Sequence, residues 1–143
     1  MFNQDKLIKI TIWLIRIGIF IILCLPLFLS SKYFFPFIAP KNIIFRIIVE
    51  ALFILYLFLA FYRKEFRPKF NKLIIAVALY FFVILLSTIF SVNVNRSLWS
   101  NFERMEGLIG QIHLFLYFIV LVNIFKKEKD WNAFFLFPFL SVY

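Results

Sequence analysis

The sequence predicts an all-α protein, a polytopic transmembrane helical bundle, and two observations support this prediction. Hydrophobic residues make up 64% of the 143 residues, and the mean hydropathy is +0.97, whereas soluble proteins are about half apolar. The charged residues, only 16% of the chain, gather between long apolar runs. We therefore expect anionic membrane lipids, and not nucleic acid, to be the partners of the net charge of +9.

Four apolar runs are long enough to cross a bilayer as helices. They cover residues 10–29, 43–62, 73–90 and 108–125, and a transmembrane helix needs about 20 residues. Each run is apolar on every face, unlike a surface helix with one apolar stripe. A fifth run, 131–143, is too short to span. The sequence thus predicts one transmembrane region, 1–143, with four full spans and a truncated fifth, belonging to a longer chain.

The first run has a second interpretation, a signal peptide, because Lys6 and Lys9 precede it. Its apolar core is longer than the usual ~7–15 residues, and no small-residue cleavage site follows. An uncleaved membrane anchor is therefore the favoured interpretation.

Lysine and arginine are distributed unequally between the two sides of the expected bundle. The richer side has ten, which are Lys6, Lys9, Arg63, Lys64, Arg67, Lys69, Lys72, Lys126, Lys127 and Lys129. The other side has four, which are Lys32, Lys41, Arg96 and Arg104. Because the richer side faces the cytoplasm, we expect a cytoplasmic N-terminus in the inner membrane. Loops 30–42 and 91–107 then face outward.

Four ionisable residues fall inside the expected spans, where they are costly unless they face protein or water. Arg16 is close enough to the cytoplasmic surface to extend its side chain back to it. Arg46 and Glu50 are spaced i,i+4, so they share a helical face within reach of each other. Either they form an ion pair that orients the helix, or Arg46 meets an anionic group in the outer leaflet.

His113 is the only histidine in the sequence. Gly110 lies one turn earlier on the same face and permits close approach of another helix, so His113 is expected to face protein. A structural histidine is one interpretation, and membership of an outward-opening polar cluster is the other. The cluster would draw on the polar residues expected in the outer half of the membrane, which are Arg46, Glu50, Ser87, Thr88, Gln111 and His113.

The second outer loop carries a capping-box pattern, with Ser100 as the expected N-cap and Glu103 at the third helical position. The pattern predicts a short amphipathic helix at the membrane surface, or an early start of the fourth span. Arg96 and Arg104 would then lie at the depth of the head groups, where guanidinium groups bind phosphate. Binding of lipid head groups without specificity is the simpler interpretation.

Motifs for catalysis or metal binding are absent from the sequence. It contains no H-E-x-x-H, phosphate-binding glycine loop or G-x-S-x-G. The single cysteine, Cys24, has no partner for a disulfide or a metal site. We therefore predict no metal and no cofactor from these residues, and catalytic residues stay unknown.

Two segments together resemble a known bacterial family. They are 34–50, FFPFIAPKNIIFRIIVE, and 90–107, FSVNVNRSLWSNFERMEG, which leads to His113. They are similar to the N-terminal region of O-antigen ligase and O-antigen polymerase-like membrane proteins. The resemblance implies a polytopic enzyme that transfers glycan from undecaprenyl pyrophosphate on the periplasmic face without a metal. The family's catalytic Arg and His lie in a later loop, so the resemblance implies no catalytic residue here, and this chain alone is expected to be inactive.

The resemblance implies that the partner is an undecaprenyl-pyrophosphate-linked glycan. Under that hypothesis Arg46, Arg96 and Arg104 bind the lipid pyrophosphate, and Glu50 and His113 form the intramembrane polar cluster. The alternative function is a small non-enzymatic membrane protein, such as a transporter subunit or an assembly scaffold.

Overall fold

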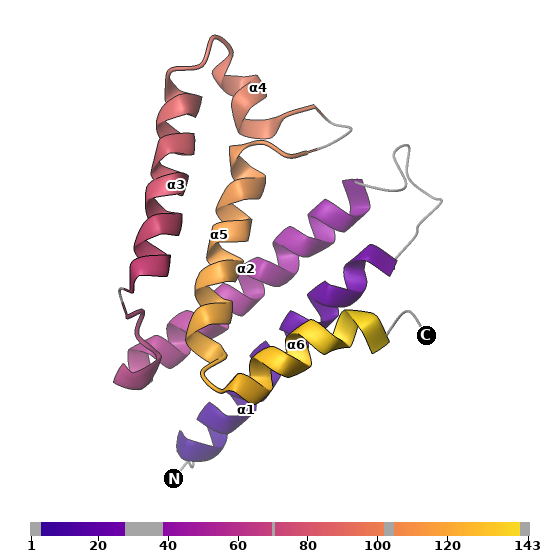
Figure 1. The fold of residues 1–143 in the computed structure, drawn as a ribbon, viewed down its shortest axis with the longest axis vertical. Coiled ribbons are helices and arrows are strands. Elements are labelled where there is room, and N and C mark those ends of the chain that lie inside the picture. The colour runs from indigo at the N-terminus through magenta and orange to yellow at the C-terminus, as the bar shows by residue number, and fades with distance from the viewer. Residues whose placement is uncertain (1–3, 28–38, 70, 102–104, 141–143) are drawn as a thin grey trace.

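The computed structural model describes residues 4–27, 39–69, 71–101 and 105–140, and these residues form helices and no strands (Figure 1). The α-helices are α1 (Gln4–Cys24), α2 (Ala39–Tyr62), α3 (Lys72–Ile89), α4 (Val94–Trp99), α5 (Leu108–Ile124) and α6 (Glu128–Leu140). Short 3-10 turns, Leu25–Leu27 and Lys64–Phe66, follow α1 and α2. The all-α prediction is confirmed.

Three helices are long and apolar enough to cross a membrane: Gln4–Cys24, Pro40–Tyr62 and Lys72–Ile89. α5 has only 17 residues, a rise of about 26 Å, because Phe125 has an extended backbone and ends it. The expected count of four full spans is therefore not confirmed. α6, with 13 residues, is too short to span, as expected of the fifth run.

α1 and α2 extend beyond the apolar runs that predicted them. α1 begins at Gln4 and α2 at Ala39, so each helix includes charged residues before its run. α3 has a defined start, where the Asn71 side chain accepts a hydrogen bond from the backbone N–H of Ile74 at 2.8 Å. Such a cap satisfies one of the free N–H groups at a helix start.

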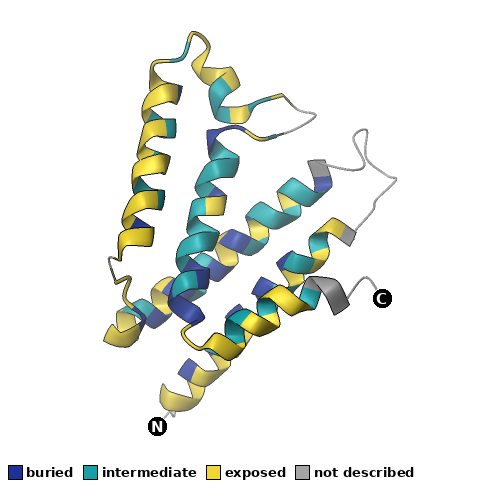
Figure 2. Ribbon diagram, in the orientation of Figure 1, coloured by how far each residue is buried: buried dark blue, intermediate teal, exposed yellow. Residues whose placement is uncertain are grey.

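α2 packs against both α1 and α5, and it lies near the centre of the bundle. α3 covers α5, and α6 folds back along α1 (Figure 1). The fully buried side chains come from α1, α2 and α5, and they include Ile15, Ile19, Val49, Leu59 and Val120. Figure 2 shows α3 exposed along most of its length. Most of its exposed residues are apolar, which suits a surface in contact with lipid.

A glycine sets the distance between α1 and α2. A Cβ atom added to Gly18 would lie 2.4 Å from Cδ2 of Leu52. A side chain at position 18 would therefore displace the side chain of Leu52, and small residues commonly let transmembrane helices approach one another. From the sequence, close approach of another helix was predicted at Gly110 and not at Gly18.

The two ends of the bundle differ in composition. We call one the basic end; it contains the N-terminal turn of α1, the α2–α3 connection and the α5–α6 connection. Asp5 pairs there with Arg63, and Lys126 Nζ donates to the Glu65 carbonyl at 2.7 Å. We call the other the α4 end; it contains residues 25–27, the first turns of α2, all of α4 and the start of α5 (Figure 1).

Candidate functional site

Arg46 lies on the second turn of α2 and reaches across to the start of α5. Its Nη2 donates to the Met105 carbonyl at 2.8 Å. A Cβ atom added to Gly110 would lie 3.7 Å from this same Nη2. The guanidinium group of Arg46 therefore lies at ordinary contact distance from α5 at Gly110.

The ion pair expected between Arg46 and Glu50 is not formed in the structure, in which both side chains are described. Glu50 Oε1 instead lies 3.0 Å from Nε2 of His113 on α5. The i,i+4 spacing was compatible with pairing, but each side chain finds a partner on the neighbouring helix. Sequence spacing within α2 carried no information about that helix.

The His113 ring is held at both nitrogens. Nδ1 lies 2.6 Å from the Ile109 carbonyl, one turn earlier in α5. A carbonyl oxygen only accepts hydrogen bonds, so Nδ1 carries a proton. His113 is buried, with 8% of its surface exposed, which confirms that it faces protein. Its contact with Glu50 joins α5 to α2.

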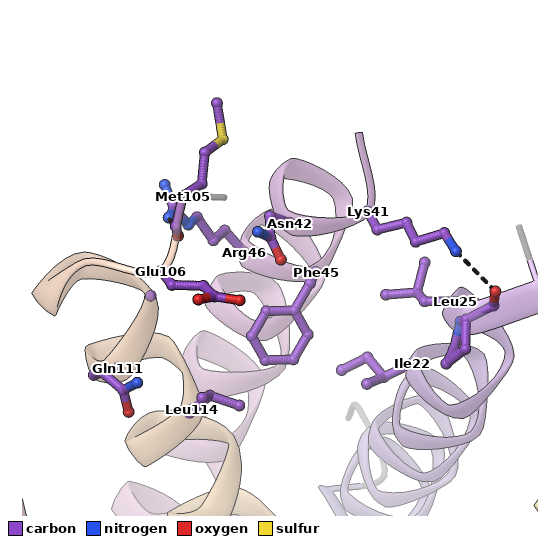
Figure 3. A pocket seen from close by; sticks show the side chains of 12 residues that line it. Ile22, Leu25, Lys41, Asn42, Phe45, Arg46, Met105, Glu106, Gln111 and Leu114 are labelled. Carbon is purple, nitrogen blue, oxygen red and sulfur yellow. Dashed lines mark hydrogen bonds between the residues drawn. The ribbon is translucent and has the colours of Figure 1, made fainter. Parts of the chain in front are cut away.

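Two cavities open at the α4 end, and Arg46 lines both of them. The first has a volume of about 420 Å³ and lies between the end of α1, the start of α2 and α5. Its polar lining residues are Lys41, Asn42, Arg46, Glu106 and Gln111 (Figure 3). Gln111 therefore faces this cavity while His113 bonds to Glu50, so the two side chains point in different directions.

The second cavity is larger, about 920 Å³, and brings together two of the candidate arginines. Arg46 lines it from α2 and Arg96 lines it from α4. The other lining residues include apolar Ile43 and Trp99. The Asn93 side chain caps α4 by accepting from the backbone N–H of Arg96 at 3.1 Å. The cap fixes the turn from which the Arg96 side chain projects.

Ser100 was expected to begin a helix, but residues 102–104, which would form its first turn, lie outside the described residues. Ser100 ends α4, with a φ of 62° in the left-handed region. The helix at the surface comes before this serine because Asn93 provides the effective N-cap. Glu103 and Arg104, which completed the expected motif and the expected site, lie outside the described residues.

Gly107 shapes the connection between α4 and α5. A Cβ atom added there would lie 2.2 Å from the Leu98 carbonyl oxygen and 2.7 Å from the Trp99 carbonyl carbon. These are backbone atoms and have little freedom to move. Glycine at this position therefore lets the end of α4 rest against the start of α5, next to the second cavity.

Other polar residues within the helices have local partners. The Thr88 hydroxyl donates to the Ile84 carbonyl of its own helix at 2.9 Å. The Thr11 hydroxyl does the same toward Leu7 at 2.9 Å. Such bonds satisfy a polar group inside an apolar helix without a ligand.

Arg16 forms an ion pair that the sequence did not predict. Its Nη2 lies 2.9 Å from Oδ2 of Asp130, in the first turn of α6. The apolar run that predicted this segment begins at residue 131, whereas α6 begins at Glu128 and so includes Asp130. The ion pair joins α1 to α6 near the basic end, away from the two cavities.

Three polar lining residues of the first cavity were not predicted: Lys41, Asn42 and Glu106. Lys41 Nζ donates to the Pro26 carbonyl at 2.8 Å, linking α2 to the turn after α1 (Figure 3). The only available signal was their position next to the ends of apolar runs, which many residues in the chain share.

Comparison with protein-family models, with curated proteins and with solved structures finds no match to this chain. Within the described ranges, no group of three or more His, Cys, Asp or Glu residues is placed to hold a metal ion.

Proposed function

We propose that this chain acts in a membrane as part of an O-antigen ligase-like glycosyltransferase, with its α4 end binding the diphosphate of an undecaprenyl-pyrophosphate-linked glycan. The observation that most supports this proposal is the placement of Arg46 and Arg96 on one cavity of about 920 Å³. The resemblance of segments 34–50 and 90–107 to that family supports it as well, because these segments contribute the two arginines.

The charge balance of the second cavity suits an anion. Its lining residues include two guanidinium groups and no carboxylate among the residues described. Arg46 uses Nη2 for the Met105 carbonyl, and a guanidinium has five N–H donors, so donors remain for a ligand. Arginine binds phosphate oxygens through two parallel hydrogen bonds. A diphosphate, with its concentrated negative charge, is therefore a fitting ligand.

The apolar lining suits the lipid portion of the same ligand. Ile43 and Trp99 line the second cavity beside the arginines. Both side chains are exposed, Trp99 by 60%, and tryptophan favours the membrane–water interface. A polyprenyl chain leaving the cavity would meet these residues first.

The orientation belongs to the same proposal: the basic end faces the cytoplasm of a bacterium and the α4 end faces the periplasm. The ten lysines and arginines counted on the richer side support it. Reporter fusions after Lys69 and after Asn95 test it. A periplasmic reporter should be active only after Asn95, and the reverse result would overturn the proposed function.

Binding of a diphosphate is the direct test. The purified protein, in nanodiscs of uncharged phosphatidylcholine, is titrated with farnesyl diphosphate. Arg46→Gln and Arg96→Gln should each weaken binding at least about tenfold, since removing a charged hydrogen-bonding partner costs about 1.5–3 kcal/mol. Arg96→Lys should restore binding only in part, because an ammonium lacks the planar fork.

Lys64→Gln provides the matched control, because it removes one positive charge from the basic end. It should leave binding unchanged. Equal loss in Lys64→Gln and Arg96→Gln would mean that only net charge matters, and the site would be wrong. Full binding by both arginine variants would favour the alternative of a non-enzymatic membrane protein.

A further inference from the structure

The hydrogen bonds made by His113 and Glu50 indicate how many protons the two side chains hold together. The Ile109 carbonyl lies 2.6 Å from Nδ1 and accepts a hydrogen bond from it, so one proton is on Nδ1. The Nε2–Oε1 distance of 3.0 Å requires a second proton between those two atoms. This proton either makes an imidazolium beside a carboxylate or a carboxylic acid beside a neutral ring. In both cases the pair has no net charge.

Loss of the shared proton would leave an unfavourable contact. A nitrogen lone pair would then face a carboxylate oxygen, and Glu50, whose side chain is 63% exposed, would carry an unpaired negative charge on the surface of the bundle. Such a charge is costly at membrane depth unless a cation pairs with it. Arg46 is one helical turn away on the same face of α2, at the i,i+4 spacing that permits an ion pair.

We propose that this shared proton regulates the anion-binding site. With the proton present, Arg46 lines both cavities and is available to an anion. Without the proton, Arg46 pairs with Glu50. The inference rests on the proposed function. In the protonated arrangement Arg46 bonds to Met105 and lines the second cavity. Rotation of its side chain toward Glu50 would break that bond and remove one of two positive charges from the cavity. Anion affinity therefore falls as pH rises through loss of the proton.

Few other ionisable groups face His113 from the helices that pack on α5. On α5 itself Tyr117 is one turn further, with its hydroxyl buried and without a hydrogen-bond partner among the described residues. On α3 the residues after Lys72 include a single ionisable group, Tyr80, which is exposed. The charged residues that pack from α1 and α4 take part in other contacts or cavities: Arg16 pairs with Asp130, and Arg96 lines the second cavity.

The single histidine makes the protonation state directly measurable. The protein, labelled with ¹⁵N-histidine and held in phosphatidylcholine nanodiscs, gives imidazole signals from His113 alone. When the pH of the sample is raised from about 5 to about 8, Nε2 should lose its proton while Nδ1 keeps its own. A tautomer with the proton on Nε2 and none on Nδ1 would overturn the inference, as would a ring that does not titrate in this range.

The same samples test the link to anion binding. The probe is dihexanoylphosphatidylglycerol, whose phosphodiester keeps one negative charge over the whole range. Its dissociation constant should rise at least about tenfold between the two ends of the titration, in inverse proportion to the fraction of binding-competent protein. In Glu50→Gln the amide can donate to Nε2 of the neutral ring, and no carboxylate competes for Arg46. This variant should bind the probe with an affinity independent of pH.

Two control variants separate this mechanism from general titration. Glu106→Gln removes a carboxylate that lines the first cavity, and Tyr117→Phe removes the buried hydroxyl. Both should keep the pH dependence of the wild-type protein. If Glu50→Gln keeps it too, the regulation is disproved. A ring that titrates as expected in a protein that binds neither probe at any pH would instead disprove the proposed function, and the regulation with it.

Discussion

Arginines at or near the basic end and arginines at the α4 end have different partners. At the basic end Arg16 pairs with Asp130 and Arg63 pairs with Asp5, each joining two helices. At the α4 end Arg46 and Arg96 line a shared cavity, and neither has a carboxylate partner among the described residues. Arginine stabilises the fold at one end and remains available for a ligand at the other.

This difference explains why charge counts alone identify neither end's role. The positive-inside rule concerns how many cations lie on a side, not what they contact. Neighbouring carboxylates decide whether a guanidinium is neutralised within the protein. The following predictions compare the two ends, in order of decreasing expected effect.

Asp130→Ala should cause the largest loss of stability, about 2–3 kcal/mol. It leaves Arg16 without its partner, and Nε of Arg16 is already buried without a hydrogen bond. Stranding a fully buried charge costs about 3–5 kcal/mol, and we reduce this because the Arg16 side chain is 40% exposed. Equilibrium unfolding in lipid–detergent micelles provides the measurement. Asp5→Ala breaks the exposed pair with Arg63 and should cost at most about 1 kcal/mol.

Gly107→Ala should destabilise the α4 end by about 2 kcal/mol, within the usual range for overpacking. The added Cβ would meet the Leu98 carbonyl oxygen at 2.2 Å, so α4 must shift, and Arg96 with it. Farnesyl diphosphate binding should weaken together with the unfolding free energy. Gly110→Ala is the matched control, because its nearest contact is 3.2 Å. Equal effects of the two substitutions would contradict the proposed role of Gly107.

A double-mutant cycle distinguishes the pair seen in the structure from the pair expected from spacing. At the acidic end of the titration, Glu50→Gln combined with His113→Leu should give a coupling free energy of about 1 kcal/mol, typical of hydrogen bonds between membrane helices. Glu50→Gln combined with Arg46→Gln should give a coupling close to zero under the same conditions. The opposite ranking would restore the Arg46–Glu50 pair.

Lys126→Gln should have the smallest effect, about 0.5 kcal/mol. Lys126 Nζ lies 4.1 Å from the centre of the Phe66 ring and donates to the Glu65 carbonyl, and an exposed cation–π contact contributes about 0.5–1 kcal/mol. Lys127→Gln is the control, since its exposed side chain makes no such contact in the described region. Thermal unfolding of both variants, compared with the wild type, provides the measurement.

Much of the candidate site could be identified from sequence, but its pairings could not. Arg46, Glu50 and His113 were recognisable because ionisable residues inside apolar runs are rare. Which of them pair depends on how α2 is rotated relative to α5, and no local pattern encodes that rotation. Glu106 and Lys41 carried no such signal, because charged residues at the ends of apolar runs are common. The sequence did not reveal that Asn93 begins a helix of its own, because Asn93 and Ser100 are both good caps.

The sequence by itself determined that the protein is helical and apolar enough for a membrane, since in a bilayer a backbone must satisfy its hydrogen bonds within each helix. Composition and run length are local properties, and they suffice for that conclusion. The tertiary structure alone decided that Glu50 contacts His113, that Arg16 contacts Asp130, and that Arg46 shares a cavity with Arg96. These contacts join residues far apart in the chain. Close approaches at Gly18 and Gly107 help to set them, through packing that no single segment specifies.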